Sequence, residues 1–180
     1  MIGIAIGHSR HGDQGAVNTS GVSEHEFNSS LVPMILANLR VGALVYDDYK
    51  ASSYVGAINY VARKMREDGV TACVELHFNS AGPTATGHEW LYWGTSKGGL
   101  KLARCFDKEM QSAYPELKAR GLKPKGRGSR GSMFLRKTPC PAVIAEPFFG
   151  SNPSDVALMQ SDLSKLAAVI AEGINQYYGR

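Results

Sequence analysis

Short apolar runs alternate along the chain with longer segments in which apolar residues recur every three or four positions. The apolar runs predict β-strands at residues 2–6, 43–46, 71–77, 87–93 and 142–145. The helical period predicts helices over residues 24–39, 53–69, 97–113 and 154–178. We place the 87–93 strand nearer a sheet edge and expect a break near Ser161 in the last helix. Strands that alternate with helices indicate an α/β fold: a single three-layer domain, with a mostly parallel mixed sheet flanked by helices on both faces.

The first helix carries a start signal in its own sequence. Ser23 is followed three residues later by Glu26, which is the spacing of a capping box. The helix is therefore predicted to begin at about Glu24. Pro33 lies inside the helix and has no backbone N–H, so we expect it to bend the helix or to shorten its start.

Length and composition fit one globular domain, so residues 1–180 are expected to form a single unit. The 180 residues are 43% hydrophobic and 20% charged, which is ordinary for a domain with a buried core. No apolar run reaches about 18 residues, so no membrane-spanning helix is expected. The first residues lack a basic region, and we expect no signal peptide. Three cysteines without close spacing predict free thiols rather than a disulfide framework.

The positive charge is concentrated in one stretch, residues 118–137, which we call the basic segment. It contains eight basic residues and no acidic one, within a net charge of +4 for the whole chain. Its glycines predict a long mobile loop that tightens into a strand near Met133 to Arg136. The segment is either a solvated loop or a surface that attracts a polyanionic partner such as cell wall, nucleic acid or a membrane surface.

Three predicted strands end in a side chain that can bind metal or transfer protons: His8, His77 and Glu146. Because the carboxyl ends of parallel strands meet at one edge of a sheet, we expect these side chains to lie close together. Glu24, at the start of the first helix, can join the two histidines. Two imidazoles and a carboxylate form the ligand set of a catalytic zinc site, and Glu146 would remain as an unligated carboxylate for proton transfer.

Other side chains could compete for the metal, and the sequence pattern alone leaves them open. They are His11, Asp13, His25 and His88. Neighbouring residues on a helix point about 100° apart, so only one of Glu24 and His25 can face the site. No serine or cysteine stands in a G-x-S-x-G nucleophile elbow, and no phosphate-binding glycine loop is present.

Five ordered sequence blocks cover nearly the whole chain. They are G-H with G-A within residues 7–16, G-V-S-E-x-x-x-N at 21–28, E-L-H-F-N-S-A at 75–81, G-x-E at 87–89 and P-A-V-I-A-E-P-F-F-G-S-N-P at 141–153. Together they resemble the zinc-dependent N-acetylmuramoyl-L-alanine amidases of the amidase 3 type. The resemblance implies that His8, Glu24 and His77 bind Zn²⁺ and that Glu146 is the catalytic carboxylate. It favours Glu24 over His25 because the family's ligand stands four residues before a helix asparagine, here Asn28.

The same resemblance implies an activity and a partner. The reaction would be hydrolysis of the amide between N-acetylmuramic acid and L-alanine in peptidoglycan. We expect a monomeric catalytic domain spanning residues 1–180, with no nucleic-acid partner. Two features depart from the family pattern. The turn G-H-S-R-H-G-D is one residue longer than the usual G-H-G-G-x-D, which leaves the role of His11 open. The loop after His77 is too short for the autoinhibitory helix of some division amidases.

The absence of that insert, together with the expected absence of a signal peptide and a wall-binding domain, points to a phage or prophage endolysin. Such a protein would be made in the host cytoplasm and would act on the wall. The alternatives are a zinc carboxypeptidase-like peptidase acting on stem peptides, a non-catalytic wall-binding module and, more weakly, nucleic-acid binding through the basic segment.

Overall fold

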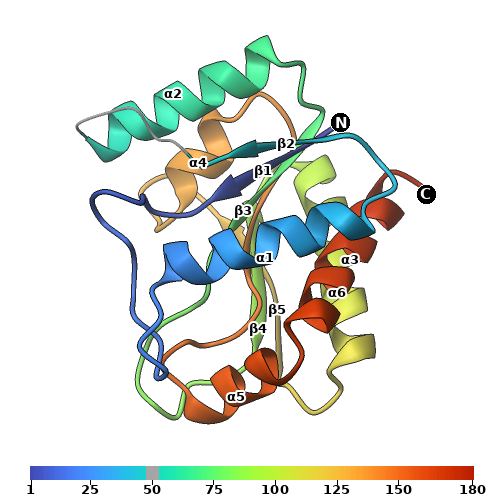
Figure 1. Ribbon diagram of the computed structural model, residues 1–180. Helices are drawn as coiled ribbons and strands as arrows, with labels where there is room; N and C mark the ends of the chain where they lie inside the picture. Colours follow the sequence, from blue (N-terminus) through green and yellow to red (C-terminus); the bar gives the residue numbers. More distant parts are fainter. Residues whose placement is uncertain (48–52) are drawn as a thin grey trace.

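The structure is a computed structural model that describes residues 1–47 and 53–180 (Figure 1). Its strands are β1 (Ile2–Ile6), β2 (Ala43–Tyr46), β3 (Ala72–Leu76), β4 (His88–Trp93), β5 (Ala119–Lys125) and β6 (Ala142–Glu146). Its helices are α1 (Glu24–Asn38), α2 (Tyr54–Glu67), α3 (Lys97–Ala113), α4 (Ser132–Lys137), α5 (Pro153–Ser161) and α6 (Leu163–Tyr177). Among the residues described, no helix combines the length and the apolar composition that crossing a bilayer requires.

Within this described part, six strands form one sheet in the order β2-β1-β3-β6-β4-β5. The first four strands of that order are parallel to one another. Strand β4 pairs antiparallel with β6, and β5 then pairs parallel with β4. The sheet is therefore mixed and mostly parallel, as predicted, and the carboxyl ends of β1, β3 and β6 meet at one edge.

Helices cover both faces of this sheet. Helices α1, α3 and α6 pack on one face, and α2 with α4 packs on the other (Figure 1). Successive residues of a strand point to opposite faces, so neighbours in β3 enter different cores. Val74 packs in the core under α1, α3 and α6, whereas Cys73 packs in the core under α2 and α4. The predicted three-layer α/β domain is confirmed.

The local signals at helix ends act as the sequence indicates. The hydroxyl of Ser23 accepts a hydrogen bond from the backbone N–H three residues later, and α1 begins at Glu24. The helix continues through Pro33, so its start is not shortened. Because Pro33 is exposed, the carbonyl group that loses its partner there can face solvent. Helix α5 ends at Ser161 and α6 begins at Leu163, which confirms the predicted break.

The basic segment has more structure than the predicted mobile loop, and the strand predicted near Met133 to Arg136 is wrong. Strand β5 is the edge strand, where Pro124 is tolerated because its missing N–H is not needed by a further strand. Strand β4 consequently lies one position in from the edge. The apolar residues Phe134 and Leu135 belong to α4 and pack in the core under α2. A short apolar run does not distinguish a strand from a buried helix, and packing against α2 decides the outcome here.

Candidate metal centre and active site

The edge formed by the carboxyl ends of β1, β3 and β6 carries the three side chains that the sequence indicates. The backbone N–H of His77 donates to the carbonyl of Ala145 at 3.0 Å, so His77 lies directly beside Glu146 on the neighbouring strand. His8 follows β1, and its ring centroid is 5.0 Å from that of His77. Glu24 reaches the same place from the first turn of α1.

Glu24 lies between the two histidines. Its Oε2 is 3.1 Å from His8 Nε2, and its Oε1 is 3.0 Å from His77 Nδ1. One ligand atom from each of these three residues lies within 4.8 Å of the others. Backbone N–H groups of Ala16 and Phe78 donate to the two carboxylate oxygens at 3.0 and 3.1 Å. The carboxylate is thus fixed at both oxygens, with one imidazole nitrogen beside each.

This cluster fits a Zn²⁺ ion by its donors and by its hydrogen bonding. Two imidazoles and one carboxylate leave the fourth position of a tetrahedral site for water. His8 Nε2 is buried and, although close to Glu24, makes no hydrogen bond within the described residues. A ring nitrogen that is directed into a polar cluster without a hydrogen-bond partner can instead donate its lone pair to a cation. The residues present therefore fit a shared metal ion.

Without a metal, protons have to balance the carboxylate charge. Burial lowers the pKa of His77, but hydrogen bonds to Glu24 and Glu75 outweigh burial and raise it to about 10. Burial likewise lowers the pKa of His8, but the adjacent Glu24 carboxylate outweighs burial and raises it above the ordinary value. Burial raises the pKa of Glu24, but the adjacent imidazoles of His77 and His8 bring it far below its usual range. The metal-free cluster therefore holds positive charge on its histidines, in the place a cation would take.

Glu146 lies beside the cluster but is held differently. The whole residue is 5% exposed, and its Oε2 is buried without a hydrogen-bond partner among the described residues. Burial is the main reason that the pKa of this carboxyl rises from 4.5 to about 7. A carboxyl group with a pKa near neutrality can both accept and return a proton, as a general base and acid must.

The chain matches the family Amidase_3, N-acetylmuramoyl-L-alanine amidase, over residues 2–176. It belongs to this family. Membership supports hydrolase activity on peptidoglycan. No curated protein sequence matches the chain significantly.

Several solved amidase structures share the fold. An N-acetylmuramoyl-L-alanine amidase from Clostridium difficile 630 has a TM-score of 0.80 at 23% identity, over 98% of this chain and 95% of that one. The catalytic domain of CwlV, an amidase from Bacillus (Paenibacillus) polymyxa, gives 0.78 at 22% identity, over 98% and 97%. The catalytic domain of an endolysin targeting Clostridia difficile gives 0.79 at 24% identity, over 97% and 96%. At these identities the likeness shows the fold.

In this amidase-family chain, glycines let the backbone approach the cluster closely. A Cβ on Gly7 would lie 2.3 Å from His77 Cε1. Gly15 has a φ of +80°, and a Cβ there would lie 2.6 Å from the His8 ring and 2.7 Å from a Glu24 oxygen. His8 itself adopts a φ of +67°, which is uncommon for a residue with a side chain. Strained backbone of this kind persists where the surroundings fix it, and it turns the His8 ring toward Glu24.

Asn28 joins the helix that carries Glu24 to the sheet. Its Nδ2 donates to the Glu24 carbonyl at 3.0 Å and to the Leu76 carbonyl at 3.3 Å. The first turn of α1 is thereby joined to the end of β3, next to His77. The spacing from Glu24 to Asn28 places both side chains on one face of the helix, so Asn28 holds the turn from which Glu24 enters the cluster.

A cavity of about 480 Å³ opens beside the cluster. His8, His77 and Glu146 line its polar side. Ile58, Leu91 and Ile144 line an apolar side, and Tyr54 and Arg130 also contribute. Such a mixture of apolar wall and a few polar groups is typical of a substrate site. A chain segment carrying an amide could lie in this cavity with its carbonyl group near the cluster.

The competing metal-capable residues lie elsewhere or contact the cluster from outside. His11 is exposed and His25 is buried near Ser29, and neither belongs to the cluster. His88 is buried in contact with Trp90 and Asp107.

Two carboxylates contact the rings of His8 and His77 from the side away from Glu24. Asp13, a competitor for the metal by sequence, lies 3.3 Å from His8 Nδ1. The second carboxylate, Glu75, was not predicted from the sequence, and its Oε2 is 3.4 Å from His77 Nε2. The available signal was the spacing of two residues in a strand, which puts Glu75 and His77 on the same face.

Proposed function

We propose that this domain, residues 1–180, is a zinc-dependent N-acetylmuramoyl-L-alanine amidase. His8, Glu24 and His77 would hold the Zn²⁺, and Glu146 would be the catalytic carboxylate. The observation that carries the proposal is the cluster of two imidazoles and one carboxylate beside a buried, unpaired carboxyl group. The family match over residues 2–176 supports the amide of peptidoglycan as the bond cleaved.

Glu146 would transfer the proton that amide hydrolysis requires. Bound zinc would supply Lewis acidity, which makes water acidic enough to attack an amide near neutral pH. Glu146 would accept the proton of the attacking water at a side-chain oxygen. It would then give that proton to the nitrogen of L-alanine as the bond to the lactyl carbonyl breaks. The apolar wall of the cavity would exclude other water from the carboxyl group and keep its pKa near neutrality.

Digestion of purified peptidoglycan tests the reaction through the ends that it creates. An amidase should release free lactyl groups on muramic acid and free amines on L-alanine. Shortened stem peptides would instead indicate a peptidase, and the absence of new ends would indicate a binding module. Glu146→Gln should leave zinc bound and abolish the new ends, and a chelator should abolish them reversibly in the unaltered protein.

We also propose a biological role as a lysin that acts as a monomer, made in the host cytoplasm and released to the wall. No helix lies between β3 and β4, where some division amidases carry an inhibitory helix. An endolysin catalytic domain shares the fold. Purified protein added to susceptible cells should lyse them, and gel filtration should give the mass of one chain. If the protein cleaved a small muropeptide but left exposed peptidoglycan uncut, the role as a lysin would be contradicted.

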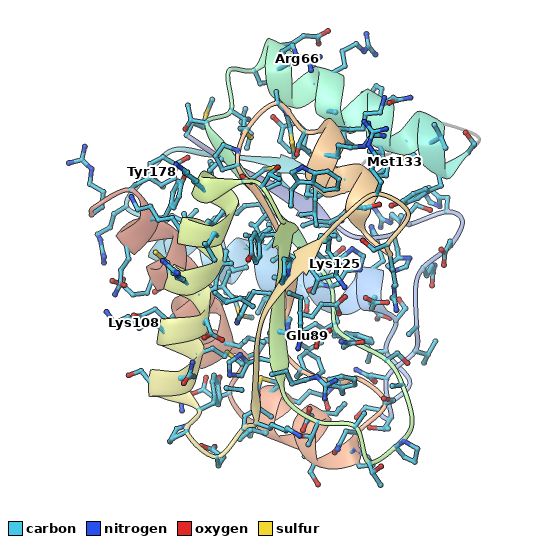
Figure 2. The ribbon with its side chains drawn as sticks, turned by 180° about the vertical axis from the view of Figure 1, so that it is seen from behind. Arg66, Glu89, Lys108, Lys125, Met133 and Tyr178 are labelled. Atoms are coloured by element: carbon cyan, nitrogen blue, oxygen red, sulfur yellow. The ribbon has the colours of Figure 1, made fainter. Side chains whose placement is uncertain are left out.

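The basic segment would assist by attracting the protein to the anionic envelope. Lys123 and Lys125 belong to β5, and Arg127 follows in the next loop. Figure 2, which views the molecule from the side opposite to Figure 1, labels Lys125. Because Arg130 lines the cavity, it is left out of the test. Replacing the other three by Gln should weaken binding to whole cells and its salt dependence while sparing a small muropeptide. Equal losses on both substrates would contradict this role.

A further inference from the structure

We propose that Glu75 is a positioning residue that fixes the imidazole of His77 for the metal. The proposal rests on the zinc site put forward above. The carboxylate of Glu75 would accept a hydrogen bond from His77 Nε2 and so leave the lone pair of Nδ1 directed at the ion. Glu75 lines the cavity beside the cluster, but in this role it would act through the His77 ring and not by binding zinc.

The geometry brackets the His77 ring between two carboxylates. On one side Nδ1 is 3.0 Å from Glu24 Oε1, and on the other Nε2 is 3.4 Å from Glu75 Oε2. The Glu75 side chain is only 8% exposed, and β3 holds it two residues before His77 on the same face of the sheet. Backbone at Gly7 lies against Cε1, the ring atom between the two nitrogens. The ring therefore has one orientation, with its two nitrogens facing different carboxylates.

Imidazole chemistry gives these two contacts different roles. A neutral imidazole donates from one nitrogen and offers a lone pair at the other, and the partner of the first decides which is which. A carboxylate can only accept, so Glu75 selects the tautomer with its proton on Nε2. Nδ1, the nitrogen inside the three-residue cluster, is then the one able to bind a cation. Partners of this kind also make the ligating nitrogen more basic.

The other histidine of the cluster, His8, also has a carboxylate beside its ring, but that carboxylate is exposed to water. His8 Nδ1 faces Asp13 at 3.3 Å, but the Asp13 side chain is 84% exposed. Water competes with an exposed carboxylate for the ring N–H, whereas little water reaches Glu75. We therefore expect the zinc affinity to depend more on Glu75 than on Asp13, although both carboxylates contact a ligand ring.

Zinc titration against a chelating indicator tests the inference on the folded protein. Glu75→Leu removes the acceptor and should weaken zinc binding by roughly 10- to 100-fold. Glu75→Gln keeps an amide oxygen as acceptor and should lose less, and Asp13→Asn should also lose less than Glu75→Leu. Glu89→Gln is the matched control. Glu89 is a mostly buried carboxylate of β4 that pairs with Glu146 in the sheet, and Asn79 and Arg120 hold it in place. Its zinc affinity should stay within about twofold of that of the unaltered protein, which is a small change compared with the loss expected when a hydrogen bond to a metal-binding histidine is removed.

A spectroscopic readout separates positioning from folding. In zinc-loaded protein, nitrogen-15 NMR should show His77 protonated at Nε2 and unprotonated at Nδ1, with the Nε2 proton shifted by its carboxylate partner. Protonation at Nδ1 would overturn the inference, as would unchanged affinity in Glu75→Leu or an equal loss in Glu89→Gln.

The failure of the zinc site itself would look different. If His77→Ala bound zinc as tightly as the unaltered protein, the metal site and this inference would both be wrong. If His77→Ala lost zinc while Glu75→Leu did not, only the role of Glu75 would be wrong.

Discussion

Glu146→Gln should make the metal-free protein more stable at alkaline pH while abolishing its activity. Glu146 as a whole residue is 5% exposed, and its Oε2 has no hydrogen-bond partner within the described residues. Ionising such a group inside the fold is unfavourable, which is why its pKa rises from 4.5 to about 7. Glutamine has the same shape and carries no charge at any pH, so the variant avoids that cost.

The pKa values give both the direction and the size of the change in the free energy of unfolding. Between pH 4.5 and about 7, the unfolded chain has lost the Glu146 proton while the folded chain still holds it. The free energy of unfolding therefore falls as pH rises through this window and stays reduced above it. At about 1.36 kcal/mol per pKa unit, the loss is about 3 kcal/mol. The variant lacks this loss, so its stability relative to the unaltered protein should grow by that amount.

Urea unfolding with a chelator present, from pH 4.5 to 8.5, measures the difference. The chelator is needed because a nearby cation would favour the ionised carboxylate. Glu116→Gln is the matched control: Glu116 is exposed, so its replacement should leave the pH dependence of stability unchanged. A Glu146→Gln curve that runs parallel to that of the unaltered protein would refute the argument from burial. Retained hydrolysis in the variant would refute the assignment of the base.

Three further results are expected. Because the pKa of His8 is raised and that of His77 reaches about 10, zinc must displace protons at pH 7 and should bind more tightly as pH rises. Calorimetry in buffers of different ionisation enthalpy measures the number of protons released. Zinc uptake without proton release would contradict this expectation. Gly7→Ala places a Cβ 2.3 Å from the His77 ring and should reduce zinc affinity, whereas Gly12→Ala meets only a flexible hydroxyl and should not. Asp155→Ala leaves two buried backbone N–H groups, those of residues 87 and 149, without an acceptor. It should lower the free energy of unfolding in urea by at least about 2 kcal/mol. A smaller loss would show that water replaces the carboxylate.

Much of the fold was predictable because its signals are local. Apolar runs marked the strands that are buried on both faces, and the hydroxyl of Ser23 fixed the start of α1. The prediction for the basic segment was wrong because its structure depends on contacts distant in the sequence. Phe134 and Leu135 form a run too short to show a period, and only their packing against α2 makes that run helical. Likewise, β5 is a strand because β4 offers it a free edge, and no residue within β5 records that partner.

The residues of the candidate site were likewise predictable from local sequence, whereas their contacts were not. The sequence by itself determined that His8, His77 and Glu146 follow buried strands, and parallel pairing then required them to share one edge. It left Glu24 and His25 open until the family resemblance favoured Glu24. Only the tertiary structure decided the distances within the cluster, the isolation of the Glu146 carboxyl and the contact between Glu75 and His77. These depend on the packing of segments far apart in the chain, which desolvates one carboxylate and gives another a partner. A residue's type and its immediate neighbours carry no record of that packing.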